Sequence, residues 1–408
     1  MSDRKQLALN KARRAYAMRP KTLCLVMIVR NESKIITRLL DSVKSVIDMV
    51  SITDTGSTDN TQKIIKNWGK TNKIPTTVHN CTFLNFGYNR TESVKLANLA
   101  YANADYFLLS DADFEWDIDG ITKFDKRMLM EDMYLVLQTN EHINYWNTRI
   151  LKSKTDFKCH GRTHEFWGYL DENIFSNSSK VSTLKIIDHE DGGCKDDKFK
   201  RDLKLLQEDI DDPNTSQMIK TRAHFYLAQT HADIGNNLDA IEWYLKRIKL
   251  GGFPEEVYYS WLRCGLASQE HYYHLRNKTD FDKKTDSEKN EMRKYFDLTV
   301  KYYRTAHKVR PTRAESLANL AKFYRDNSMN QESYDVCLIG EKIEYPKNDS
   351  LFINYRAYNY LFDFEKHIVC DYINKHEEGK EALQRLLSRD DLFPFEIETV
   401  TNNCKFYI

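Results

Sequence analysis

The sequence lacks an excess of either charge, a long apolar run and any C-x-x-C pair of cysteines. Its 408 residues carry 61 Lys+Arg against 60 Asp+Glu, so neither nucleic acid nor an anionic membrane is an expected partner. The apolar runs are shorter than the roughly 18 residues of a membrane span. The eight cysteines are scattered and indicate neither a disulfide framework nor a zinc cluster. The basic arm formed by residues 1–20 has no apolar signal segment, so we expect a cytoplasmic protein.

The length exceeds that of a usual single domain of roughly 100–200 residues, so we expect two domains after the basic arm. In residues 21–194, short apolar runs alternate with helical periodicity, which predicts an α/β domain with a mostly parallel sheet. The strands expected there include residues 23–29, 50–53 and 106–110, with helices opening near residues 34, 58 and 88. In residues 195–408 amphipathic helices take over, which predicts an all-helical second domain.

The helical domain contains two segments with tetratricopeptide-like spacing. Thr221 to Leu250 and Arg313 to Pro346 carry small and aromatic residues at offsets typical of a helix pair, although Ser333 stands where Ala is usual. The tyrosine doublets of this domain are predicted to belong to its core. Residues 277–290 are polar and rich in Lys and Asp, and we expect a solvated loop there. Stacked helix pairs can hold an extended peptide or mediate a homodimer, and the sequence leaves both open.

The triplet Asp111-Ala112-Asp113 directly follows an apolar strand. Ligands of open α/β sheets bind at the carboxyl ends of strands, and paired carboxylates suit Mg²⁺ or Mn²⁺ bridging a pyrophosphate. Surface turns also supply such pairs often, so the triplet needs support from elsewhere in the chain. Asp54 ends another predicted strand, before a turn at Gly56-Ser57, and its carboxylate could accept a hydrogen bond from a nucleobase. The alternative is that Asp54 and Ser57 only cap the next helix.

Four motifs occur in the order found in family 2 glycosyltransferases of GT-A fold, and the chain resembles that family. They are Met27-Ile28-Val29-Arg30-Asn31-Glu32, Thr53-Asp54-Thr55-Gly56-Ser57-Thr58-Asp59, Tyr88-Asn89-Arg90 and Leu109-Ser110-Asp111-Ala112-Asp113. The likeness is strongest to a branch that carries tetratricopeptide-like helices behind the catalytic domain, and it covers roughly residues 21–375.

The resemblance implies roles for residues of these motifs. Asp54 would contact the uracil of a UDP-sugar, Arg90 the diphosphate, Asp111 the ribose or sugar, and Asp113 the metal, with Asp111 beside it. Val29 and Glu32 would line the nucleotide pocket, and Asn89 and Ser110 would complete it. Many relatives have a Tyr over the base at the position of Arg30, which here could stack its guanidinium there or face solvent.

Two later elements complete the resemblance. The segment Gly161-Arg162-Thr163-His164-Glu165 is similar to a Gly-x-Val-His-Glu element, with Thr163 in place of the apolar residue, and makes Glu165 the candidate general base. A structural His-Glu pair is the alternative from local sequence. A final strand over residues 184–189 ends in His189, which the resemblance makes a third metal ligand, and His164 competes for that role.

The leading hypothesis is an inverting, Mn²⁺- or Mg²⁺-dependent enzyme. It would transfer a hexose or N-acetylhexosamine from a UDP-sugar to a protein, peptide or glycan acceptor. The alternative is an inactive sugar-nucleotide domain that serves as a scaffold or peptide-binding protein, motivated by the degenerate repeats and by Arg30 and Thr163. A nucleotidyltransferase is disfavoured because the chain lacks a Gly-rich, basic phosphate loop.

Overall fold

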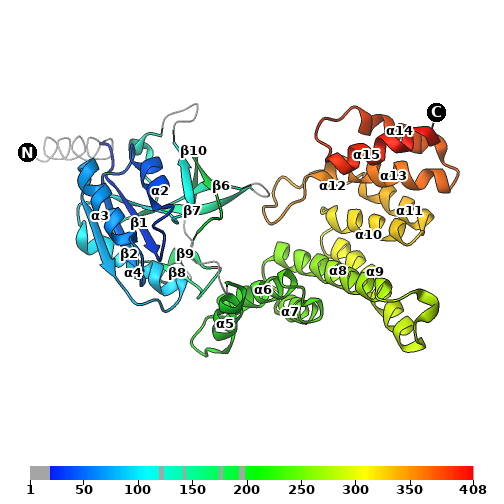
Figure 1. Cartoon of the computed structure of the whole chain (residues 1–408), viewed down its shortest axis with the longest axis horizontal. Helices are drawn as coiled ribbons and strands as arrows, with labels where there is room; N and C mark the ends of the chain where they lie inside the picture. The colour runs from blue at the N-terminus through cyan, green and yellow to red at the C-terminus, as the bar shows by residue number, and fades with distance from the viewer. Residues whose placement is uncertain are drawn as a thin grey trace, which may run out of the picture. The chain divides into compact units, whose positions relative to one another are not determined.

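The computed structural model describes residues 19–118, 124–140, 144–172, 174, 178–192 and 198–407. The predicted basic arm lies outside these residues except for its last two, and so does Cys194. The chain divides into two compact units, Met1–Asp212 and Pro213–Ile408 (Figure 1). The seven described cysteines are free thiols. Among the described residues, no helix has the length and apolar character needed to cross a membrane.

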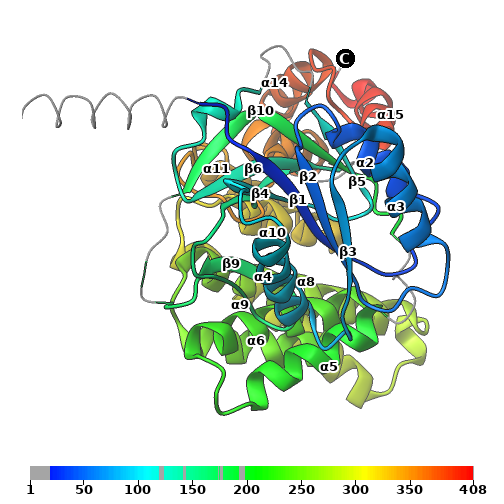
Figure 2. The same cartoon turned by 90° about the vertical axis from the view of Figure 1, so that its left-hand side faces the viewer.

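The first unit is built on an eight-stranded sheet in the order β3-β2-β1-β4-β7-β6-β10-β5. The first four of these strands are parallel and lie side by side in Figure 2, and β6 and β10 are also parallel. The strands are β1 (Leu23–Val29), β2 (Met49–Asp54), β3 (Thr76–Asn80), β4 (Tyr106–Leu109), β5 (Phe114–Asp117), β6 (Met133–Thr139), β7 (Asn144–Lys152) and β10 (Ser178–Asp188). The mostly parallel sheet is confirmed, but β5 and β7 run antiparallel to their neighbours, which the sequence did not predict.

Alternation along β1 explains how helices cover both faces of this sheet. Leu23, Leu25 and Met27 share one buried cluster with α2 (Ile36–Val43) and α3 (Thr61–Asn72). Cys24 and Val26 point to the other face, where α4 (Phe86–Ala100) contributes Val94 and Ala97. Because both faces are buried, the strand is a continuous apolar run, as the sequence predicts for a parallel sheet.

The helix α5 (Lys198–Asp211) belongs to the first unit, although the sequence placed the domain boundary near residue 195. The backbone N–H of Arg162 donates to Asp209 Oδ2 (2.8 Å), and its guanidinium contacts Asp209 Oδ1 (2.6 Å). A second, two-stranded sheet is formed by β8 (Phe157–His160) and β9 (Phe166–Tyr169). Arg162 lies in the loop between these two strands. Charged contacts of this kind join α5 to the α/β unit despite its helical sequence pattern.

In the described residues of the second unit, the secondary-structure elements are helices joined by loops. Its helices are α6 (Gln217–Asp233), α7 (Asn237–Leu250), α8 (Pro254–Asn277), α9 (Asp286–Val309), α10 (Glu315–Asp326), α11 (Asn330–Gly340), α12 (Arg356–Asn359), α13 (Leu361–Tyr372), α14 (His376–Leu387) and α15 (Pro394–Asn403). The predicted helix pairs are α6–α7 and α10–α11. Ser333 fits where Ala is usual because its buried hydroxyl donates to Ala321 O (2.8 Å).

The expected loop over residues 277–290 is shorter than predicted. The helix α9 begins at Asp286, behind a capping box in which Thr285 and Glu288 satisfy each other's backbone N–H groups. The predicted core tyrosines are confirmed at Tyr258 and Tyr303, whose side chains are fully buried. The fold is therefore an α/β domain followed by an all-helical domain, as predicted.

His367, on α13, is a buried histidine held in its neutral form. Its Nδ1 lies 2.5 Å from Phe364 O, which can only accept, so Nδ1 carries the proton. Its Nε2 lies 3.2 Å from Asn403 Nδ2, an amide nitrogen that can only donate. Burial lowers the pKa of His367 from 6.5 to about 4. Protonation would set an N–H against the Asn403 amide in a dry site.

We expect the helical unit to lose stability as the pH falls from 6.5 towards 4. Over that range the unfolded chain binds a proton at His367 that the folded chain does not, so the loss grows to about 3 kcal/mol. Urea unfolding followed by circular dichroism at several pH values measures it. His367→Gln should flatten this dependence, whereas His376→Gln, at an exposed histidine, should leave it unchanged. Equal slopes in both variants would contradict the role of His367.

Candidate active site

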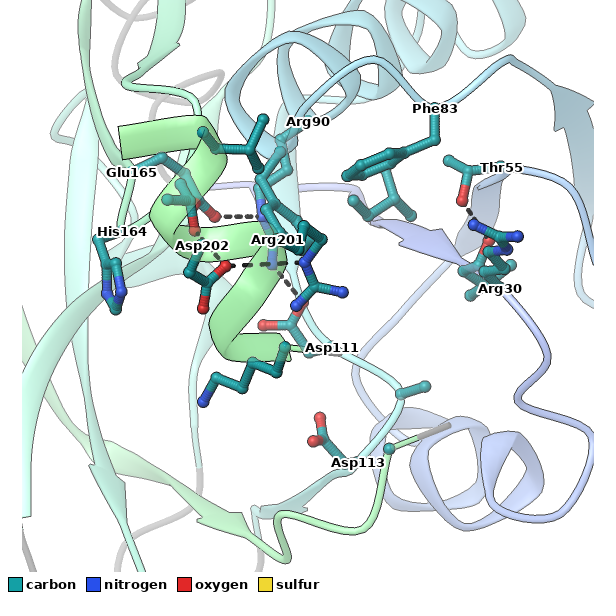
Figure 3. Close-up of a pocket in the computed structure, with 18 of the residues that line it drawn as sticks. Arg30, Thr55, Phe83, Arg90, Asp111, Asp113, His164, Glu165, Arg201 and Asp202 are labelled. Carbon is teal, nitrogen blue, oxygen red and sulfur yellow. Dashed lines mark hydrogen bonds and ion pairs between the residues drawn. The ribbon is translucent and has the colours of Figure 1, made fainter. Parts of the chain in front are cut away.

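A cavity of about 970 Å³ lies in the first unit, at the carboxyl ends of β1, β2 and β4. Its lining includes Val29, Arg30 and Glu32 after β1, Thr55 after β2, and Asp111 and Asp113 after β4. Arg90 of α4 and Glu165 also face it (Figure 3). Since neighbouring parallel strands end at one edge of the sheet, residues far apart in sequence meet there. The size is typical of a small-molecule site.

Arg90 joins two carboxylates at the centre of this cavity. Its Nη2 lies 2.6 Å from Asp111 Oδ1, and its Nε lies 2.6 Å from Glu165 Oε1. Arg149, on β7, contacts the other oxygen of Asp111 at 3.2 Å and Gln138 Oε1 at 2.8 Å. Burial raises the pKa of Asp111, but the charges of Arg90 and Arg149 outweigh burial and hold it below its ordinary value. Asp111 is therefore an ionised, arginine-bound carboxylate.

Asp113 has the opposite environment. Burial raises its pKa to about 6, and the negative charges of Asp111, Asp188 and Asp191 act in the same direction. Arg38, the nearest candidate counter-ion, is engaged by Asp191 at 2.7 Å. Among the described contacts, no cationic side chain reaches the Asp113 carboxylate. A buried carboxylate surrounded by others is suited to a divalent cation.

Asp54 closes the turn after β2 without capping the next helix. Its Oδ1 accepts hydrogen bonds from Gly56 N (2.8 Å) and Ser57 N (2.7 Å), whereas α3 begins only at Thr61. The capping alternative is therefore wrong. Its Oδ2 is buried and has no hydrogen-bond partner among the described residues. An unpaired buried carboxylate oxygen is costly and is typical of a ligand site.

The geometry agrees with a family assignment for this part of the chain. Residues 24–187 match the family model of Glycosyl transferase family 2. The N-terminal domain belongs to glycosyl transferase family 2. No curated protein sequence matches the chain significantly.

Two solved structures are similar to parts of this chain, one a complex of TarS with UDP and the other a TPR protein. TarS residues 1–349 of S. aureus, in complex with UDP, is 13% identical with a TM-score of 0.29, over 70% of this chain and 90% of that chain. A thermophilic TPR protein of Thermus thermophilus is 10% identical with a TM-score of 0.34, over 51% of this chain and 91% of that chain. These TM-scores are too low to transfer residue roles to this chain.

Four predicted site residues do not line the cavity, namely Asp54, Asn89, Ser110 and His189. Asn89 is fully buried, and its side chain binds the backbone of Thr82, Leu84 and Asn85, which shapes the loop before α4. The Ser110 hydroxyl accepts a hydrogen bond from Trp116 Nε1 (3.0 Å). Both side chains support the walls of the site from behind.

The two histidine candidates for the metal lie in different places. The backbone N–H of His189 donates to Asp113 O (3.1 Å), but its ring pairs with Glu115, with Nε2 2.8 Å from Oε2. His164 lies on the Glu165 side of the cavity, apart from Asp113 (Figure 3). In the described part of the chain, no three His, Cys, Asp or Glu side chains are gathered as a ready cation site. Of the residues predicted to bind the metal, Asp111 and Asp113 line the cavity and His189 does not.

Several cavity residues were missed from sequence. Gln138, Arg149 and Asp188 come from β6, β7 and β10, and α5 contributes Lys198, Arg201, Asp202 and Lys204. A buried Gln or Arg within an apolar strand was a local sign that could have drawn attention to Gln138 and Arg149. The α5 residues had no such sign, because their sequence resembles that of any amphipathic helix.

We expect Arg90→Met to lower the free energy of unfolding by about 3 kcal/mol, because it leaves two largely buried carboxylates without their shared cation. Urea denaturation measures this change. Lys95→Met, on the same helix, removes an exposed ion pair with Glu92 and should change stability by less than about 0.5 kcal/mol. Equal effects of the two substitutions would show that Arg90 does not hold the site together.

Proposed function

We propose that this chain is an inverting, metal-dependent glycosyltransferase. It moves a hexose or N-acetylhexosamine from a UDP-sugar to a protein, peptide or glycan acceptor. The observation that carries the proposal is the meeting of Arg90, Asp111 and Asp113 in one cavity at the strand ends of a family 2 domain.

The nucleotide side of the cavity is the side of Arg30 and Thr55, opposite Glu165 (Figure 3). The free Oδ2 of Asp54 can accept the single N–H that uracil presents on its pairing edge. Arg90 offers donors to the diphosphate, and Asp111 lies where ribose or sugar hydroxyls can donate to it. A divalent cation on Asp113 would neutralise the charge that develops on the leaving diphosphate.

UDP with Mn²⁺ should bind the wild-type protein more tightly than UDP alone, and Asp113→Ala should remove that difference. Isothermal calorimetry measures both, with GDP and dTDP as comparison nucleotides and Asp117→Ala, at an exposed carboxylate, as the matched control. Turnover of a UDP-sugar should likewise stop in EDTA. Activity that persists in EDTA and in Asp113→Ala would end the metal proposal, and absent UDP binding would favour a scaffold.

Inverting transfer needs a carboxylate that takes the proton of the acceptor as it attacks the anomeric carbon. The family resemblance assigns this role to Glu165. If Glu165 is that base, Glu165→Gln leaves the affinity for UDP with Mn²⁺ unchanged and lowers transfer by about 100-fold or more. Calorimetry and turnover on the same preparation check the two parts separately. Arg90 Nε, however, donates to Glu165 Oε1 at 2.6 Å.

A further inference from the structure

The helix α5 places one carboxylate, Asp202, in the wall of the active-site cavity. Asp202 is 3% exposed and lines the cavity on the side of Glu165 and His164 (Figure 3). The hydroxyl of Thr163 donates to its Oδ1 at 3.2 Å, and Arg201 Nε lies 3.6 Å from the same oxygen. Burying a carboxylate with so few strong donors is costly. Its place in the cavity lining makes it a candidate for contact with a bound substrate.

Three carboxylates converge on this part of the cavity, and their partners differ. Asp111 is held by Arg90 and Arg149, and Glu165 by Arg90 at 2.6 Å. Asp202 has a neutral hydroxyl and a guanidinium beyond hydrogen-bond distance. A carboxylate that takes a proton must not be held firmly by an arginine. Arg90 lies 2.6 Å from Glu165 Oε1, whereas Arg201 forms a longer ion pair of 3.6 Å with Asp202, so Asp202 is the least firmly held of the three.

We propose that Asp202 is the catalytic residue that accepts the proton of the acceptor, and that Glu165 positions Arg90 for the diphosphate. This inference rests on the glycosyltransferase function proposed above. The acceptor's oxygen, nitrogen or sulfur bonds to the anomeric carbon as that carbon's bond to the diphosphate oxygen breaks. The electron pair leaves with UDP, and the acceptor's proton passes to Asp202. No oxidant, reductant or further reactant is needed.

Thr163 fits this role for Asp202. The Thr163 hydroxyl meets Asp202 Oδ1 at 3.2 Å in a buried contact. A neutral donor of this kind orients the carboxylate without neutralising its charge, which leaves Asp202 able to accept a proton.

A purely structural role for Asp202, anchoring α5, is the rival explanation, and Asp209 supplies the control. Asp209 lies on the same helix, is equally buried at 3% exposed, and does not line the cavity. It binds Arg162 through the backbone N–H (2.8 Å) and the guanidinium (2.6 Å). Asp209 is an anchor of α5, so its loss should affect stability rather than chemistry.

The test compares Asp202→Asn, Asp209→Asn and Glu165→Gln with the wild-type full-length chain. UDP release from UDP-glucose and UDP-N-acetylglucosamine, with water as acceptor and Mn²⁺ present, gives kcat across the pH range. Calorimetry with UDP plus Mn²⁺ gives donor affinity, and thermal unfolding gives Tm. Thr163→Val, which keeps the carboxylate but removes its hydroxyl partner, serves as a second variant should Asp202→Asn fold poorly.

We expect Asp202→Asn to lower kcat by about 100-fold or more. Its donor affinity and Tm should stay near wild type. Asp209→Asn should lower Tm and leave kcat unchanged. Thr163→Val should reduce kcat far less than Asp202→Asn does. Glu165→Gln should weaken donor binding, because Arg90 loses its charged contact with Glu165.

Three results would overturn the assignment of Asp202. The first is a kcat of Asp202→Asn within about tenfold of wild type. The second is an equal loss of kcat in Thr163→Val, which would show that anchoring is the whole role of Asp202. The third is Glu165→Gln with unchanged donor affinity and no turnover, which returns the base role to Glu165. Wild-type protein that binds no UDP would instead refute the proposed function itself, and the two failures are therefore distinguishable.

Discussion

The ion pairs of Arg90 are the interaction on which the candidate site depends. One guanidinium, on α4, joins Asp111 after β4 to Glu165 beyond the first strand of the small second sheet, with both contacts at 2.6 Å. A largely buried cation with two carboxylates costs desolvation free energy that good geometry must offset. The arrangement therefore fixes three segments of the chain relative to one another. It also keeps the Arg90 guanidinium in place in the cavity lining.

The walls of the cavity separate two kinds of chemistry. The residues after β1 and β2 are short turns, tied by hydrogen bonds from Asn31 N to Ser57 Oγ (2.9 Å) and from Thr58 N to Asn31 Oδ1 (2.7 Å). They form the wall that we propose to hold the nucleotide. The opposite wall comes from the loop around Thr163 and from α5, which is held there by charged anchors such as Asp209. Under the proposed function, acceptor chemistry can change through α5 without disturbing the turns after β1 and β2.

The parts of the fold and site that could be predicted from sequence are those that local pattern determines. A continuous apolar run such as β1 is typical of a strand buried on both faces, and Asp54 and Asp111 follow such runs, so their positions at the sheet edge were predictable. Arg149 and Gln138 lie on β7 and β6. A polar residue inside a strand is a local sign, but the antiparallel pairing of β7 with β4, which brings these side chains to the site, leaves no local sign in the sequence. Asp202 was missed for a related reason. The amphipathic sequence pattern of α5 is that of the helices in the second unit. Contacts such as that of Asp209 with Arg162 place α5 in the α/β unit.

Under the proposed function, the charge balance of the cavity favours binding of a cation and a diphosphate together. Six cationic side chains (Arg30, Arg90, Arg149, Lys198, Arg201, Lys204) face seven carboxylates (Glu32, Asp111, Asp113, Glu165, Asp188, Glu190, Asp202). A diphosphate alone would add negative charge to a lining that already has a slight negative excess. Arg90 and Arg149 could not balance that charge, because they are already paired with Asp111 and Glu165. A divalent cation alone would find Asp113 but too few further ligands among the described residues. If both bind, the phosphate oxygens complete the coordination of the cation, and the cation neutralises the charge of the diphosphate. In that proposal Asp113, whose pKa is raised to about 6, is the protein ligand of the cation.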